Sequence, residues 1–419
     1  MANAFETYES NVRSYCRSFP TVFTSAKGAV LTDGNGKTYI DFFSGAGGVN
    51  YGHNHPYIKE QVMEYLQSDG IIHALDMYTP AKEAFISYFQ SNILEPKGFE
   101  YKIQFTGPTG TNAVEAALKL ARKVTGRTNI FALMGAFHGM TMGSLALTTD
   151  ASSRGGAGMP LSGVTHIPAP YMYPEMDTVD YMETLITDDH SGVEKPAAVV
   201  LEAVQADGGI YPMPVEYLQK LRAMCDRHNV LLIVDDIQAG CGRSGNFFAF
   251  ERAGIVPDMV TLSKSIGGMG MPMALLLMKP ELDIWSPGEH TGTFRGNQLS
   301  LVAAKAGLEV FVKENIAQQV AQKEALVADF MKHEIETINP AITTRGIGLL
   351  WGVDLSALGG DALSKAVMTR CFEKGLVLER VGRDNAVMKL MPTLTVEPEL
   401  LTKGLTILRD SIQEVLKEA

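Results

Sequence analysis

The chain has 419 residues, of which 46% are hydrophobic and 20% are charged, and its formal net charge is −11. This is the composition of a globular protein, and because single cores stop growing near about 250–300 residues, we expect two domains. The acidic balance and the lack of a basic stripe argue against a nucleic acid partner.

The first twenty residues contain no continuous apolar stretch, and no segment approaches the roughly 18 apolar residues of a membrane-spanning helix. We therefore expect a soluble, cytoplasmic protein that makes no membrane contact. The four cysteines lie far apart in the sequence, which argues against a disulfide framework and a zinc site. They are Cys16, Cys225, Cys241 and Cys371. We predict no metal.

Near the N-terminus, residues 29–43 (AVLTDGNGKTYIDFF) contain two strand-like runs around Asp33-Gly34-Asn35-Gly36, which predicts a hairpin. From about residue 102 to residue 278, short apolar runs alternate with amphipathic segments. The predicted strands are YKIQF, NIFALMGAF, AAVVLEAV, VLLIVDD, DMVTLS and ALLLM, and the predicted helices are VEAALKLARKV and VEYLQKLRAMCDRH. This alternation predicts an α/β fold in which helices cover both faces of a mostly parallel sheet, with ligands beyond the carboxyl ends of the strands.

The C-terminal part opens with a long helical pattern over residues 303–338. Strand-like runs follow at 349–355 and 386–391, and a helix closes the chain. This pattern predicts a separate, smaller α+β unit, to which we also assign the N-terminal hairpin. The expected division is 1–55 and 311–419 for the small domain and 56–310 for the large one.

Three clusters lie at the ends of predicted strands. The first, residues 106–112 (TGPTGTN), follows a strand and precedes a helix. Glycine allows the backbone to approach a ligand, and the free N–H groups of a helix N-terminus attract an anion, so a phosphate fits here. A turn with a helix cap is the alternative reading. The segment lacks the Gly-Lys-Ser/Thr ending of a nucleotide-binding loop, which disfavours nucleotides.

The other two clusters supply charge. Asp235 and Asp236 end the apolar VLLIV run, where a buried carboxylate caps a helix, binds a metal or pairs with a cationic ligand. Lys264 ends the DMVTLS run. Most lysines are solvated surface groups, but burial at a strand end lowers the pKa of an amine towards that of a nucleophile. Lys264 follows Asp235 by 29 residues.

This spacing and the surrounding segments resemble the fold-type I aminotransferases, and most closely their class III branch, from about residue 29 to residue 394. The resemblance implies a seven-stranded, mostly parallel sheet and pyridoxal 5'-phosphate as the cofactor. It implies that Lys264 holds the cofactor as a Schiff base and acts as the catalytic acid and base, and that Asp235 pairs with the pyridinium nitrogen.

The same resemblance implies the remaining cofactor contacts. Gly110 and Thr111 would bind the phosphate, Phe137 would stack on the ring and Gln238 would bond the ring hydroxyl, while Thr293 would reach the phosphate in a neighbouring subunit. A homo-oligomer, at least a dimer with shared active sites, follows from that last contact. The full set of implied cofactor residues is Gly110, Thr111, Phe137, His138, Glu202, Asp235, Gln238, Lys264 and Thr293.

His53 and His55 of GHNHP could suggest a metal pair, but the family resemblance favours a structural loop.

The ornithine-type members of the family carry a switching glutamate and a carboxylate-binding arginine, which align here with Asp207 and Lys389. We expect these two residues to form an ion pair that opens when the carboxylate of glutamate binds Lys389. Met140 also replaces an arginine of the ornithine type.

Segments such as ESNVRSYCRSFP (residues 9–20) and HTGTFRGNQLSL (residues 290–301) resemble one subgroup of the family, the diaminobutyrate–2-oxoglutarate aminotransferases of ectoine biosynthesis. The resemblance implies small-molecule amino and oxo acids as partners. Glutamate would load the cofactor with an amino group, and L-aspartate 4-semialdehyde would receive that group to give L-2,4-diaminobutyrate.

Several alternatives remain at this point. The nearest are other class III ω-aminotransferases of the ornithine, 4-aminobutyrate or acetylornithine type, and an amine-shifting mutase with the same cofactor. A nicotinamide oxidoreductase would need a glycine-rich dinucleotide turn after a strand, which the sequence lacks. A non-catalytic binding protein would be colourless when purified.

Overall fold

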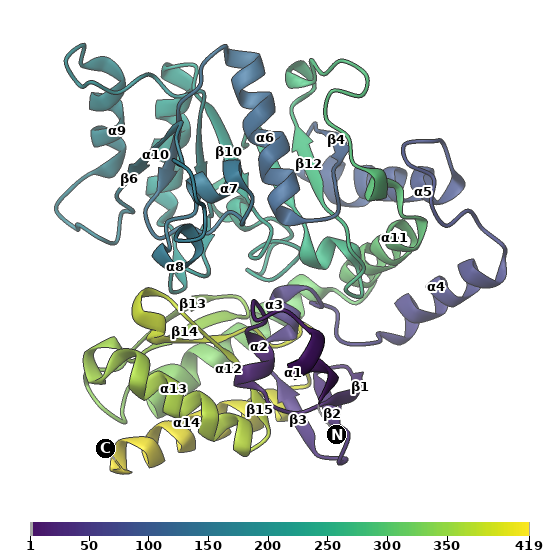
Figure 1. Ribbon diagram of the computed structural model, residues 1–419, viewed down its shortest axis with the longest axis vertical. Coiled ribbons are helices and arrows are strands. Elements are labelled where there is room, and N and C mark those ends of the chain that lie inside the picture. Colours follow the sequence, from purple (N-terminus) through teal and green to yellow (C-terminus); the bar gives the residue numbers. More distant parts are fainter. Residues whose placement is uncertain (1–2, 419) are drawn as a thin grey trace.

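The computed structural model describes residues 3–418 and has two bodies (Figure 1). The upper body contains a seven-stranded sheet with the order β4-β12-β11-β10-β7-β5-β6, and the lower body carries both chain ends. The strands of the large sheet are β4 (Lys102–Phe105), β5 (Ile130–Leu133), β6 (Val164–Ile167), β7 (Ala198–Leu201), β10 (Leu231–Asp235), β11 (Met259–Leu262) and β12 (Leu275–Met278).

The predicted seven-stranded, mostly parallel sheet is confirmed. Strand β12 runs antiparallel to β11 and to β4, whereas the pairs from β11 through β10, β7 and β5 to β6 are parallel. The sequence pattern did not predict β6. This strand lies at the sheet edge and is only partly buried, so Thr165 and His166 interrupt the apolar run that marks the inner strands.

Helices cover both faces of this sheet, as predicted. Ile233 of β10 packs in one core cluster with apolar residues of α6 (Gly110–Thr125), and Leu232 and Val234 pack in another with residues of α10 (Val215–Arg227). Successive side chains of a strand point to opposite faces, so β10 is buried on both sides. The other helices of this body are α5 (Pro80–Phe89), α7 (Met142–Leu147), α8 (Ala151–Arg154) and α9 (Thr178–Thr187).

The lower body joins the two chain ends in one sheet. Strands β1 (Phe23–Lys27), β2 (Val30–Asp33) and β3 (Thr38–Asp41) form the predicted hairpin region, and β3 pairs in parallel with β15 (Leu376–Val377). A second sheet has the order β13-β14-β17-β16. Its strands are β13 (Thr343–Ile347), β14 (Leu350–Asp354), β16 (Glu379–Val381) and β17 (Val387–Leu390), and α13 (Gly360–Glu373) and α14 (Pro398–Glu418) accompany them.

Short elements complete the chain. They are α1 (Ala4–Tyr8), α2 (Tyr15–Ser18), α3 (Ser44–Gly47), the two-stranded β8 (Val204–Gln205) and β9 (Tyr211–Pro212), and helical turns at Lys264–Gly267 and Thr293–Gly296. Within residues 3–418 no helix combines the length and the apolar character that a membrane crossing requires.

The helical pattern over residues 303–338 is not one helix. The structure has α11 (Gln298–Lys313) and α12 (Ile316–Phe330), and a wider helical turn follows at Met331–Ile335. Asn315 separates the two helices with a left-handed φ of 50°. Apolar residues continue on both sides of the break, so periodicity alone does not reveal it.

Helices α4 (Pro56–Gln67) and α11 connect the two bodies. One core cluster contains Ile58 and Val62 of α4, Ala303 and Ala306 of α11, and many C-terminal residues. This shared core crosses the expected domain limits, so the division at residues 55 and 310 stays a prediction.

The backbone behind Lys264 packs directly on α11. Gly268 has a φ of +75°, and a Cβ atom built on it would lie 2.1 Å from the carbonyl oxygen of Ala303. Gly307, one helical turn further along α11, lies so close that its Cβ would meet the Cα of Gly268 at 3.0 Å. Only glycine allows this approach, so the segment after Lys264 has little freedom to move.

We predict that Gly268→Ala lowers the free energy of unfolding by about 3 kcal/mol or more, because it adds both a left-handed strain and a clash with backbone. Urea denaturation of the purified protein measures this change. Gly156→Ala is the control, since its Cβ would meet no atom within 4 Å. A loss below about 1 kcal/mol for Gly268→Ala would contradict the packing described.

Candidate active site

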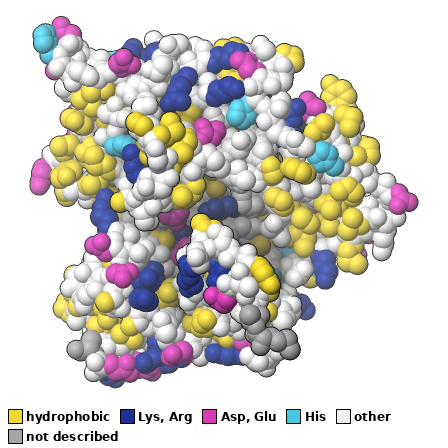
Figure 2. Space-filling view, viewed as in Figure 1, with side chains coloured by type: hydrophobic (Ala, Val, Ile, Leu, Met, Phe, Trp, Pro, Cys, Tyr) yellow, Lys and Arg dark blue, Asp and Glu magenta, His cyan; other side chains and the backbone are white. Residues whose placement is uncertain are grey.

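A cavity of about 260 Å³ lies at the carboxyl ends of the central strands. Figure 2 shows the surface hollowed between the two bodies, where acidic and basic side chains gather. Most of the site residues expected from the sequence line this cavity. They are Gly110, Thr111, Phe137, His138, Glu202, Asp207, Asp235, Gln238 and Lys264. Thr293 and Lys389 are not among the lining residues.

The first strand-end cluster forms the N-terminus of α6. Thr109 caps the helix by accepting a hydrogen bond from the backbone N–H of Asn112 at 3.3 Å. A Cβ on Gly110 would come within 2.9 Å of the Cδ1 atom of Ile237, so a larger residue there would displace that side chain. The hydroxyl of Thr111 shares hydrogen bonds with Thr141 and Ser144. Free N–H groups, hydroxyls and the positive end of the helix together suit a phosphate.

Asp235 faces the cavity and is fixed by three contacts. One carboxylate oxygen lies 2.7 Å from Nδ1 of His138, and the other accepts hydrogen bonds from the Thr261 hydroxyl at 3.1 Å and the Ile237 backbone N–H at 3.2 Å. Burial by itself would lower the pKa of His138, but the hydrogen bond and charge of Asp235 raise it above its ordinary value. Asp235 is therefore held against a histidine that keeps its proton.

Asp236 has a different position, which the sequence left open. Its Oδ2 atom accepts a hydrogen bond from the Ala249 backbone N–H at 3.0 Å, and its Oδ1 atom is buried without a partner. Burial raises the pKa of Asp236 to about 8, so this carboxyl is largely protonated near neutral pH. Asp236 does not line the cavity, and of the two aspartates only Asp235 can meet a ligand there.

Glu202 is the second carboxyl group at the cavity wall. Its two oxygens accept hydrogen bonds from the backbone N–H groups of Phe137 and Ala206, each at 3.1 Å. Burial raises its pKa to about 7, although the charge of His138 opposes the shift. Glu202 thereby holds the backbone of Phe137 at the cavity.

Lys264 begins the helical turn after β11 with a left-handed φ of 53°. Within residues 3–418 its amine has no hydrogen-bond or ion-pair partner that satisfies the distance limits for either contact. Burial lowers the pKa of this amine, and the nearby charge of Asp207 opposes that shift. A half-buried amine with a lowered pKa and no contact partner in the described part of the chain is suited to act as a nucleophile and as a base.

The expected ion pair between Asp207 and Lys389 is present, with Nζ of Lys389 at 2.6 Å from Oδ1 of Asp207. A second carboxylate, Glu379, lies 3.0 Å from the same amine, and the hydroxyl of Tyr15 donates to Glu379 at 2.9 Å. Burial would raise the pKa of Asp207, but the charge of Lys389 holds it below its ordinary value.

The sequence interpretation did not include Glu379 or Tyr15. Glu379 follows the apolar run LVL, and a charge inside a strand-like run was a usable signal. Its partner depends on the register of β16 against β17, which pairs Glu379 with Lys389. Register is a tertiary property, so the sequence did not identify the pair.

Thr293 lies outside the cavity wall, and Met140 lies at the cavity with an exposed side chain. Thr293 is exposed on the Thr293–Gly296 turn, and its carbonyl oxygen lies 2.7 Å from Nε2 of His73. Met140 lines the cavity with a side chain that is 54% exposed.

The two histidines of the GHNHP segment contact different carboxylates. Nε2 of His53 lies 2.7 Å from Asp41, and Nε2 of His55 lies 3.3 Å from Glu314. In the described part of the chain, neither belongs to a group of side chains spaced like metal ligands. These contacts explain both histidines as structural residues of the loop.

The chain is similar to known proteins over nearly its whole length. The family model for class-III aminotransferases matches residues 13–412. The chain is 49% identical to the diaminobutyrate–2-oxoglutarate transaminase of Bordetella parapertussis, over 99% of this chain and 95% of that protein. It is also 49% identical to the protein of the same name from Halalkalibacterium halodurans, over 99% of this chain and 97% of the relative.

Solved structures agree in fold. The ornithine aminotransferase of Toxoplasma gondii, which has partial occupancy of PLP at its active site, is 25% identical and superposes with a TM-score of 0.86. The match covers 99% of this chain and 94% of the other. The family model, the two relatives and the shared fold all describe the same kind of enzyme, and this chain belongs to the class-III aminotransferases.

Proposed function

We propose that the protein transfers the amino group of L-glutamate to L-aspartate 4-semialdehyde, giving L-2,4-diaminobutyrate and 2-oxoglutarate. The structural observation that carries the transamination is the half-buried amine of Lys264, which has no contact partner among residues 3–418 and lies in the same cavity as Asp235. The choice of substrates is supported by the 49% identity to diaminobutyrate–2-oxoglutarate transaminases over 99% of the chain. In the cytoplasm this reaction would begin ectoine biosynthesis and so serve osmotic adaptation.

The residues of the cavity fit pyridoxal phosphate, the cofactor of this family. The start of α6 at Gly110 and Thr111 offers free N–H groups and hydroxyls to the phosphate. Gln238 has a buried carboxamide oxygen, Oε1, without a partner, which is a polar group that a ligand could satisfy. Asp235 supplies a fixed anion for the ring nitrogen, and the side chain of Phe137 lies at the cavity wall beside it.

The protein residues divide the chemistry between them. When bound, pyridoxal phosphate withdraws electrons from the carbon that carries the substrate amine. Asp235, which is fixed by its contact with His138, would pair with the ring nitrogen and favour its protonated form. Lys264, which lies opposite no fixed counterion, is free to remove the proton of the reacting carbon and to return it at another atom.

We predict that Lys264→Ala lowers the rate of amino transfer from glutamate by at least about 1000-fold, because the variant lacks both the attachment amine and the base. Borohydride reduction of the wild-type protein should fix the cofactor to the peptide that contains Lys264. Lys403→Ala removes an exposed lysine and is the control. Reductive labelling of another lysine in the wild type would refute the assignment.

Asp207 and Lys389 are proposed to bind substrate. Glutamate carries a carboxylate on the carbon that reacts, so its binding needs a cation, whereas the reacting carbon of diaminobutyrate carries none. Lys389 is fully buried, and Asp207 covers it at 2.6 Å with a side chain that is 32% exposed. Movement of Asp207 would expose the amine of Lys389 to the carboxylate of glutamate.

We predict that Lys389→Ala reduces kcat/KM for the glutamate half-reaction by about 100-fold and does not reduce kcat/KM for the diaminobutyrate half-reaction, because the reacting carbon of diaminobutyrate carries no carboxylate that needs the cation. Single-turnover absorbance changes of the cofactor measure each half-reaction separately. Equal losses in the two half-reactions would exclude a selective role for Lys389.

We further propose that two copies of the chain share their active sites. The surface around Thr293 is strongly apolar: Tyr78 is fully exposed, and Phe294, Met77 and Ile71 are more than half exposed. Figure 2 shows hydrophobic side chains gathered on the side of the molecule that carries α4 and α5. An apolar patch of this kind on a protein surface favours association.

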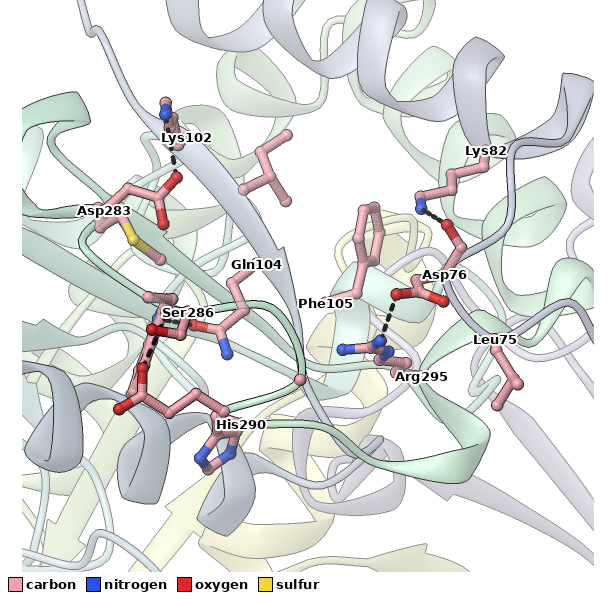
Figure 3. Close-up of a pocket in the computed structure, with 15 residues that line it drawn as sticks. Leu75, Asp76, Lys82, Lys102, Gln104, Phe105, Asp283, Ser286, His290 and Arg295 are labelled. Carbon is pink, nitrogen blue, oxygen red and sulfur yellow. Dashed lines mark hydrogen bonds and ion pairs between the residues drawn. The ribbon is translucent and has the colours of Figure 1, made fainter.

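The segment that carries this patch is held in a defined shape. Arg295 lies 2.6 Å from the carboxylate of Asp76, and Lys82 donates to the backbone oxygen of Asp76 at 2.9 Å (Figure 3). These residues, together with Leu75 and Phe105, line a second cavity of about 250 Å³, which is distinct from the cavity at Lys264. A fixed apolar surface next to Thr293 is consistent with a threonine that acts in the neighbouring copy rather than in its own cavity.

We predict that the double variant Tyr78→Asp and Phe294→Asp sediments as a single chain, because two charges would be buried in the interface. The wild type should sediment as at least two chains, and the variant should also lose cofactor affinity. Tyr8→Asp, which places a charge at an 86% exposed tyrosine elsewhere, should leave both properties unchanged. A monomeric wild type with full cofactor affinity would refute the shared site.

A further inference from the structure

The ion cluster beside the cavity has one cation and two anions. Lys389 contacts both Asp207 and Glu379, so the formal charge of the three side chains is −1. A simple pair of Asp207 and Lys389 would be neutral. The additional carboxylate of Glu379 therefore gives the cluster a net negative charge.

Glu379 and Asp207 are held in different ways. Glu379 lies on β16, directly opposite Lys389 of β17, and it accepts a hydrogen bond from the Tyr15 hydroxyl. Burial, followed by the charge of Glu379, raises the pKa of Tyr15, so this hydroxyl keeps its proton and can donate it. Lys389 and Glu379 are thus a cross-strand pair within one sheet, which stays together if other contacts change.

Asp207 belongs to the other body of the molecule. It lies on the turn between β8 and β9, lines the cavity, and contacts the C-terminal part through Lys389 and through a backbone oxygen that accepts the N–H of Gly382 at 2.9 Å. When Asp207 moves away from Lys389, Glu379 still compensates the buried amine. This second counterion reduces the cost of opening the Asp207 contact, because a buried charge without a partner is strongly unfavourable.

The cluster acts on the reacting amine. Asp207, Lys389 and Glu379 are, in that order, the charges that most affect the pKa of Lys264. A substrate whose reacting end lies at Lys264 therefore extends into a field with an excess of negative charge. Its other end is favoured when that end carries a positive charge.

We propose that the pair of carboxylates on Lys389 selects the diamine substrate by attracting its second, non-reacting ammonium group, with Glu379 as the specificity-determining residue. This inference rests on the diaminobutyrate reaction proposed above. With the γ-amine at the reacting position, diaminobutyrate carries its α-ammonium two carbons away. Glutamate has no second cation, so Glu379 has no ammonium group of glutamate to attract and affects glutamate binding only through its contact with Lys389.

The substrate 4-aminobutyrate provides a matched probe, because it differs from 2,4-diaminobutyrate only in the missing α-ammonium group. The quantity to measure is the ratio of kcat/KM for the half-reactions of the two amines with the pyridoxal phosphate holoenzyme. We expect the wild type to favour diaminobutyrate, and Glu379→Gln to lower this ratio by roughly tenfold, the size of one lost charge contact at intermediate dielectric.

Two controls separate charge from structure. Glu399→Gln removes an exposed carboxylate in α14 and should leave the ratio unchanged, and Glu379→Asp keeps the charge and should keep the ratio within about threefold. If Glu379→Gln cannot be purified with its cofactor, Asp207→Asn removes the other negative charge and must lower the same ratio.

The outcomes are distinguishable. A ratio that is unchanged in Glu379→Gln, or lowered equally in Glu399→Gln, overturns the inference while diaminobutyrate remains a substrate. A wild-type holoenzyme that transfers no amino group from diaminobutyrate overturns the proposed function itself. A lowered ratio with the glutamate half-reaction changed by less than about threefold supports both.

Discussion

The proposed chemistry depends on a lysine amine, that of Lys264, which has no counterion within contact distance among residues 3–418. Removing an amine from water disfavours its charged form, and burial is the main cause that lowers the pKa of Lys264. The surrounding structure maintains this unfavourable arrangement: the residue has a left-handed backbone, and the glycine contact with α11 fixes the segment that follows. A mobile segment would let the amine reach solvent and recover its ordinary basicity.

Carboxylates around that amine differ in charge because their surroundings differ. Asp235 has a buried histidine at 2.7 Å, whereas Asp236, the next residue, has a pKa raised to about 8 by burial. Glu202, also buried, has a pKa raised to about 7 and accepts hydrogen bonds from backbone groups that carry no charge. The raised pKa values of Asp236 and Glu202 reduce the negative charge beside Asp235 and so limit the repulsion inside the site.

The opposite side of the cavity addresses a different requirement, since the amino donor of the proposed reaction, glutamate, and its amine product, diaminobutyrate, differ in charge. A single buried cation suits glutamate, and an excess of carboxylate suits a diamine. Lys389 has a fixed partner on its own sheet, Glu379, and a second partner on the other body, Asp207. The cluster can therefore present either a cation or an excess of carboxylate. The site therefore needs both bodies. Asp207 comes from the upper body, and Glu379 comes from the lower body, where the N-terminal Tyr15 donates a hydrogen bond to it.

The sequence by itself determined the α/β fold, the order of most strands and the strand-end positions of Gly110, Asp235 and Lys264, because apolar periodicity and local turn signals are short-range properties. It did not reveal the edge strand β6, whose polar residues tolerate solvent, or the break at Asn315 within a continuous apolar pattern. The family resemblance already indicated Asp235 and the pair of Asp207 and Lys389, but only the tertiary structure decided that Asp236 lies away from the cavity and that Glu379 also contacts Lys389. Those facts depend on strand register and on burial between segments hundreds of residues apart, and neither leaves a local signal in the chain.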